Sequence, residues 1–125
     1  MTPRAVALGL GMLFVLLTLA ELLFGGWQLG QAEILRRTTM LNLLHWVVAL
    51  ALLGAFFAGE GPSRVAARVV GLALLALGIW GLLSSNTLGS FLGFPDEIPG
   101  LYNAYHASAA VLALIGGFGS ARQPA

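Results

Sequence analysis

The chain has 125 residues, of which 58% are hydrophobic and 9% are charged, and its formal net charge is +1. Soluble domains carry about 25% charged residues, so this composition excludes a water-soluble globular domain and indicates a lipid bilayer. Six arginines against five acidic residues offer no basic surface for nucleic acid. Because the chain has no cysteine, any metal or cofactor would depend on His, Glu, Asp or backbone atoms.

Four apolar stretches predict the fold. Each has about 20 residues, which is the length needed to cross about 30 Å of hydrocarbon. We place membrane spans at residues 5–24, 40–59, 65–85 and 101–119. The first stretch is longer than the apolar core of a signal peptide, so we expect it to be retained. The prediction is an all-α integral membrane four-helix bundle that forms a single domain over residues 1–125.

The links between the spans are predicted to be of different kinds. Residues 60–63 read Glu-Gly-Pro-Ser, and because a Gly-Pro pair is expected to stop a helix, we predict a tight hairpin there. Residues 86–100 form a longer link that contains two prolines. Within it, the apolar segment 91–94 is expected to anchor at the membrane surface or to contact a membrane partner.

Arginine and aromatic residues near the span ends predict the orientation. Positive charges are enriched on the cytoplasmic side of a membrane, and one side of the predicted bundle has four arginines against two on the other. We therefore expect both termini to be cytoplasmic. The inner membrane of a bacterium is the expected location, since the Ala, Leu, Gly and Arg bias is typical of a GC-rich bacterial genome. An outer interfacial belt is predicted for five aromatic residues: Trp27, Trp46, Trp80, Tyr102 and Tyr105.

The second and fourth predicted spans open with the same motif, Asn-x-x-His. It occurs at Asn42 and His45 and again at Asn103 and His106, and these are the only two histidines in the chain. The two asparagines and the two histidines are each 61 residues apart. An even number of spans in each half keeps both halves in the same orientation. We therefore predict two parallel-duplicated transmembrane hairpins.

The chain resembles a known family in these motifs. The paired Asn-x-x-His openings, together with the glycine-rich helix ends at Gly54 and at Gly116 and Gly117, resemble the small bacterial four-span membrane proteins called the domain of unknown function 4383 family. The resemblance covers most of the chain. It implies the four-span fold and no particular activity, because the activity of that family is not established.

The two Asn-x-x-His motifs supply candidate cofactor-binding residues. Asn42 and His45 share one helical face, as do Asn103 and His106, and both pairs lie at the same depth. Sequential spans are neighbours in an up-down bundle, so the second and fourth spans are expected to face each other diagonally. Two facing imidazoles can ligate a haem such as haem b. Room for the porphyrin is expected from small residues: Gly71, Gly78, Gly81, Ala49, Ala107 and Ala110.

Glu21 lies about one turn before the end of the first span, at nearly the depth of the histidines. An acid inside the hydrocarbon costs a few kcal/mol unless it has a partner. Glu21, His45 and His106 are therefore candidate ligands of a divalent metal, since catalytic zinc sites use three protein ligands. Two interpretations stay open: Glu21 faces the bundle beside the histidines, or it reaches the interface and pairs with Arg36 or Arg37.

A structural interpretation competes with ligand binding. Asn and His side chains form hydrogen bonds between membrane helices, and small residues let such helices approach closely. In this alternative Asn42 bonds to His106 and Asn103 bonds to His45. The protein would then be a structural or accessory subunit that packs against a membrane-protein partner or a second copy.

Enzymatic activity has little support in the sequence, which contains no nucleophile elbow, phosphate loop or His-Glu-x-x-His motif. Two classes of function therefore stay open. One is a membrane protein that binds a cofactor, a metal ion or a proton at the His pair, and the other is a structural subunit.

Overall fold

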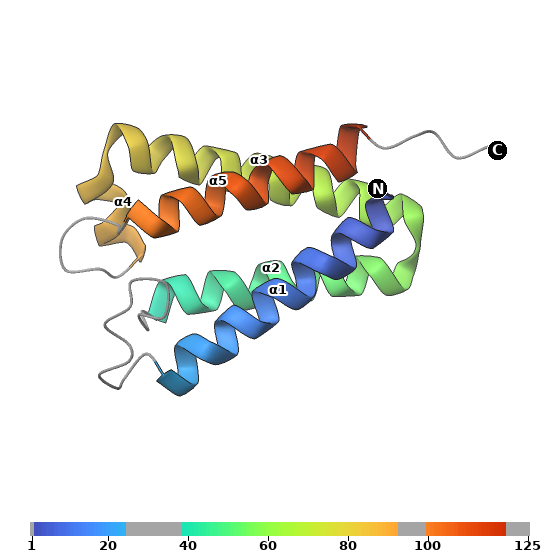
Figure 1. Ribbon diagram of the computed structural model, residues 1–125, viewed down its shortest axis with the longest axis horizontal. Helices are drawn as coiled ribbons and strands as arrows, with labels where there is room; N and C mark the ends of the chain where they lie inside the picture. Colours follow the sequence, from blue (N-terminus) through green and yellow to red (C-terminus); the bar gives the residue numbers. More distant parts are fainter. Residues whose placement is uncertain (1, 25–38, 93–99, 120–125) are drawn as a thin grey trace.

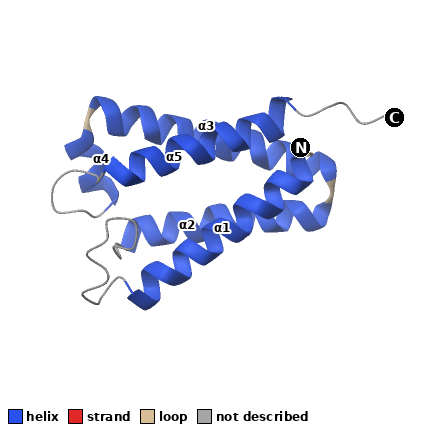
Figure 2. Cartoon of the chain, viewed as in Figure 1, coloured by secondary structure: helices blue, strands red, loops and turns tan. Residues whose placement is uncertain are grey.

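The computed structural model describes residues 2–24, 39–92 and 100–119, and these residues are almost entirely helical (Figure 2). Three helices are long and apolar enough to cross a membrane, over Pro3–Leu23, Met40–Ala58 and Glu60–Leu83. The helical elements, in chain order, are α1 (Pro3–Phe24), α2 (Thr39–Ala58), α3 (Glu60–Leu83), α4 (Ser85–Leu92), α5 (Gly100–Leu114) and the π-helical segment η3 (Ile115–Gly119).

The long helices form two antiparallel pairs that lie side by side (Figure 1). α1 packs along α2, and α3 packs along α5. α2 and α5, which carry the two histidines, lie diagonally and make no close backbone contact within the described residues, as the sequence predicted. α4 lies where α3 ends and α5 begins, and we call this the α4 end of the bundle. The opposite end, where α1 begins, is called the Arg4 end.

The hairpin between α2 and α3 is tighter than predicted. Only Gly59 separates the two helices, and its φ of 124° lies in a region that favours glycine. α3 begins at Glu60, so the expectation that the Gly-Pro pair stops a helix is wrong here. Pro62 falls in the first turn, where the N–H that proline lacks would have had no partner within the helix. The hydroxyl of Ser63 donates to the Ala55 carbonyl at 3.0 Å and joins the two helices.

The link predicted at residues 86–100 is partly helical, because it contains most of α4. Leu92 is fully buried and Phe91 is half exposed, whereas the remainder of the predicted surface segment, 93–94, lies outside the described residues. The fourth predicted span corresponds to α5 followed by η3. The 15 residues of α5 alone extend over roughly 22 Å at 1.5 Å per residue, which is less than the thickness of the hydrocarbon.

The buried apolar side chains form two layers with the polar residues between them. The main core lies along α1, α2, α3 and α5 and includes Phe14, Leu52 and Leu74. A smaller cluster, which we call the α4 layer, occupies the α4 end and consists of Leu41, Leu88, Leu92 and Tyr102. Large apolar side chains such as Leu82 and Leu83 face outward. That distribution suits a surface covered by lipid.

Two arginines stabilise the helix ends at the Arg4 end. Arg4 Nε of α1 donates to the Phe56 carbonyl at 2.9 Å, and Arg68 Nε of α3 donates to the Gly117 carbonyl at 2.8 Å. The Arg4 guanidinium lies 4.8 Å from the centre of the Phe56 ring, and that of Arg68 lies 4.5 Å from the centre of the Phe118 ring. Carbonyls in the last turn of a helix lack partners within the helix, so each arginine satisfies one and joins the two helices of its pair.

Candidate functional site

Glu21 and His45 form a buried pair between α1 and α2. Glu21 Oε1 lies 2.7 Å from His45 Nδ1, and the two side chains are 0% and 3% exposed. This confirms the prediction that Glu21 faces the bundle and lies close to a histidine. The alternative, an interfacial Glu21, is wrong because the side chain has no exposed surface; its suggested partners Arg36 and Arg37 lie outside the described residues.

A second polar contact lies one turn away from the pair. Asn42 Nδ2 donates to the Thr18 carbonyl at 3.3 Å, and the Thr18 hydroxyl donates back to the Phe14 carbonyl of its own helix. Thr18 precedes Glu21 by three residues, just as Asn42 precedes His45 by three. Residues at this spacing lie on one helical face, so the Asn42 contact sets the register in which His45 meets Glu21.

His106 comes to the same place from α5. The centres of the His45 and His106 rings are 6.1 Å apart with an interplanar angle of 77°, and His106 is also buried. The prediction that the two histidines approach one another across the diagonal is therefore confirmed. Phe14 and Tyr105 fill the space around them. The Phe14 ring centre lies 5.4 Å from that of His45, and the Tyr105 ring centre lies 5.5 Å from that of His106.

Four buried polar atoms in this region have no hydrogen-bond partner among the described residues. They are Glu21 Oε2, His45 Nε2, the Tyr105 hydroxyl and His106 Nδ1. We call these four residues the buried polar centre. Buried polar groups nearly always have a partner, and each one left without a partner costs about 1–3 kcal/mol. Their concentration at one place indicates a site for a polar species, since apolar side chains there would avoid this cost.

Tyr105 was not recognised as a site residue from the sequence, which assigned Tyr102 and Tyr105 to an interfacial belt. That assignment is wrong for both. Tyr102 is 1% exposed and belongs to the α4 layer. Tyr105 packs against both histidine rings and its hydroxyl is buried. Its position directly before His106 was the only signal in the sequence.

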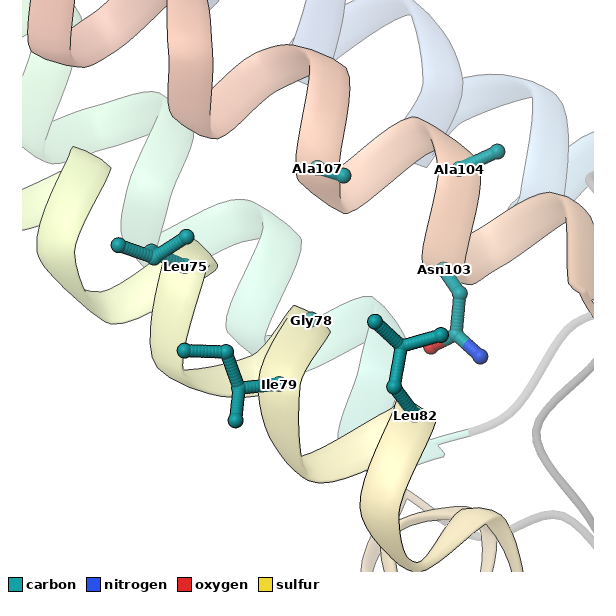
Figure 3. Close-up of a pocket in the computed structure, with 7 residues that line it drawn as sticks. All are labelled: Leu75, Gly78, Ile79, Leu82, Asn103, Ala104 and Ala107. Atoms are coloured by element: carbon teal, nitrogen blue, oxygen red, sulfur yellow. The ribbon is translucent and has the colours of Figure 1, made fainter.

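Asn103 does not join the centre. Its side chain extends from α5 toward α3, beside Leu82 (Figure 3). A Cβ added to Gly81 would collide with Asn103 Oδ1, so Asn103 occupies the space that this glycine leaves. The cross-pairs expected in the structural interpretation are not formed, because Asn42 bonds to the Thr18 carbonyl and Asn103 packs against α3. Asn103 instead borders an apolar groove of about 420 Å³ whose other lining residues are Leu75, Gly78, Ile79, Leu82, Ala104 and Ala107.

The packing does not fit a porphyrin between the histidines. Of the glycines expected to make room, Gly71 is covered by Leu114 and Gly81 by Asn103. Gly78 borders the groove between α3 and α5, whose lining contains neither histidine. Since aromatic rings already contact both imidazoles, a haem would have to displace the core around them.

The residues proposed as metal ligands are close together but do not form a three-ligand group. Within the described part of the chain, no set of three or more His, Asp or Glu side chains is placed to hold a metal ion. The Glu21 carboxylate contacts Nδ1 of His45, a position from which it orients the ring and leaves Nε2 pointing elsewhere. The arrangement thus has one carboxylate bound to an imidazole, and a second imidazole nearby.

Comparisons with known proteins add no relative: no family model matches the chain, and no curated protein or solved structure is similar to it. The function therefore has to be argued from the buried polar centre itself.

Proposed function

We propose that the chain is a four-span membrane protein that binds a cation at the buried polar centre formed by Glu21, His45, Tyr105 and His106. The observation that carries this proposal is the buried contact of 2.7 Å between Glu21 and His45, with His45 Nε2 and His106 Nδ1 both left without partners. A carboxylate and the lone pairs of neutral imidazoles all accept a positive species. An anion would be repelled by Glu21.

The four-span, duplicated arrangement is supported by the arginine contacts. Phe56 and Gly117, whose carbonyls accept from Arg4 and Arg68, are separated in sequence by the same 61 residues as the two histidines. Gly11 packs on Leu53 and Gly71 packs on Leu114, and these leucines are also 61 residues apart. α5 and η3 together make a continuous helical segment over residues 100–119, which is close to the length of a span.

The location in a bacterial inner membrane, with both termini in the cytoplasm, belongs to the same proposal, as does membership of the domain of unknown function 4383 family. Gly116 lies against Val6, so the first turns of α1 and the end of η3 meet at the Arg4 end. An even number of crossings requires that both ends of the chain lie on one side.

A structural subunit is the second candidate, and the Asn42 contact with Thr18 favours it. In that case the buried polar centre serves only to hold α1, α2 and α5 together. The two candidates differ in whether any cation occupies the centre.

The test is cation occupancy of the purified protein in lipid nanodiscs. Metal content is measured by mass spectrometry, and protonation of the two histidines is measured by ¹⁵N NMR. We expect a bound metal or a bound proton that is lost in Glu21→Gln and retained in the control Glu60→Gln, whose carboxylate lies at the Arg4 end. A metal-free protein whose imidazoles stay neutral throughout, and in which Glu21→Gln changes stability alone, would support the structural subunit.

A further inference from the structure

We infer that the cation at the buried polar centre is a proton, which the Glu21–His45 pair exchanges with His106. This inference rests on the proposed function and narrows it to one ion. It is argued from the charge of the centre, from the space around it and from the geometry of the ring nitrogens.

The charge of the centre matches a single positive charge. The groups that face it are Glu21 from α1, His45 from α2, and Tyr105 and His106 from α5, with Tyr102 nearby on α5. α4 has no charged side chain, and the charged residues of α3 all lie in its first nine residues, toward the Arg4 end. One carboxylate balances one proton. A divalent metal would leave a net charge in the apolar interior, which costs several kcal/mol.

The space around the centre also favours the smallest ion. Phe14 and Tyr105 contact the imidazoles, and the two grooves that the structure shows on the surfaces of α3 and α1 are lined by neither histidine. The α4 layer covers the centre toward the α4 end, and the main core covers it toward the Arg4 end. A metal ion needs additional ligands or retained water, whereas a proton adds no volume.

The ring nitrogens supply the route of exchange. His45 Nδ1–H donates to Glu21 Oε1, and a proton on His45 Nε2 makes an imidazolium that the carboxylate neutralises. Transfer breaks the N–H bond at His45 Nε2 and forms one at His106 Nδ1, so the total charge does not change. Rings joined by a direct hydrogen bond have centres about 5 Å apart. At 6.1 Å, transfer needs a small ring movement or one bridging water.

The experiment is a pH titration of the full chain with ¹⁵N-labelled histidine in nanodiscs, combined with metal analysis. The chain has only two histidines, so His45→Gln and His106→Gln assign every ring signal. We expect the signals of both rings to change together in one step that accounts for a single proton. We also expect no stoichiometric metal, loss of the joint step in Glu21→Gln and its retention in Glu60→Gln.

The outcomes separate this inference from the proposed function. Stoichiometric metal that disappears in His45→Gln and His106→Gln would overturn the proton and leave the cation site in place. Two independent titration steps without metal would overturn the exchange, because they would show that His45 and His106 are not coupled. Neutral imidazoles throughout, without metal, would overturn both the inference and the proposed function. All three readings start from the wild-type protein, so they stand even if a variant fails to fold.

Discussion

The polar contacts between α1 and α2 repeat at the spacing of a helical turn. Asn42 meets the Thr18 carbonyl, and three residues later His45 meets Glu21. Both contacts join residues that are 24 apart in sequence, so the two helices keep one register over this turn. In an apolar interior such contacts are selective, because any other rotation of α2 would leave Glu21 without a partner.

Removal of the Glu21 carboxylate is predicted to destabilise the fold. In Glu21→Ala, His45 Nδ1 loses its partner in a buried site, which costs about 1–3 kcal/mol in the free energy of unfolding. Glu21→Gln should cost less, because its amide oxygen still accepts from Nδ1–H. Thermal unfolding in detergent, followed by circular dichroism, measures the difference. Equal stability of Glu21→Ala and wild type would show that the contact contributes nothing to folding.

The close approach of α3 and α5 depends on Gly81. A methyl group there would collide with Asn103 Oδ1, so Gly81→Ala is predicted to lower the unfolding temperature. Overpacking of this kind typically costs about 1–3 kcal/mol. Gly9→Ala is the matched control, because nothing lies within 4 Å of its added Cβ. If Asn103→Ala in the same chain does not restore the stability of Gly81→Ala, the proposed collision is not the cause.

At the scale of elements, the two helix pairs use the same arginine device. Each first helix supplies an arginine whose Nε reaches a carbonyl near the end of the second helix and whose guanidinium covers a phenylalanine ring. η3 replaces the last α-helical turn of the second pair, and a π-helical turn is wider than an α-helical one. Gly116 and Gly117 let this wider turn pack against Val6 and Arg68.

Replacement of these arginines should therefore have matching effects. Arg4→Met and Arg68→Met each remove one hydrogen bond and one cation–ring contact, and we expect each to cost about 1 kcal/mol in unfolding free energy. Arg4→Lys and Arg68→Lys keep the charge and serve as controls, because lysine lacks the Nε–H that makes the bond. A loss in only one helix pair would argue against their equivalence.

At the scale of the whole molecule, the proposed topology places both ends of the chain on one side of the membrane. The chain has no cysteine, so single-cysteine variants report sidedness without background. Thr2→Cys and Gly119→Cys, both at exposed positions of the Arg4 end, should react with a membrane-impermeant thiol reagent from the same side. Ser84→Cys at the α4 end should react from the other side. Reaction of Thr2→Cys and Gly119→Cys from opposite sides would mean an odd number of crossings.

Much of the helical layout was predictable because it depends on consecutive residues. The apolar runs at residues 5–24 and 40–59 became α1 and α2 with shifts of one or two residues. The start of α3 was missed because proline was treated as a stop signal without regard to its position in the turn. α4 was missed because its short apolar pattern resembles a surface loop until Leu88 and Leu92 are buried against Leu41.

The sequence alone determined an all-helical chain with long apolar helices, and the equal depth of the two histidines, because length and spacing along a helix are local properties. Only the tertiary structure decided which polar side chains meet. It turned Glu21 toward His45, brought Tyr105 beside both imidazoles and directed Asn103 to α3. These contacts depend on how each helix is rotated against its neighbours. That rotation is set by the packing of side chains across helices, which no single stretch of sequence contains.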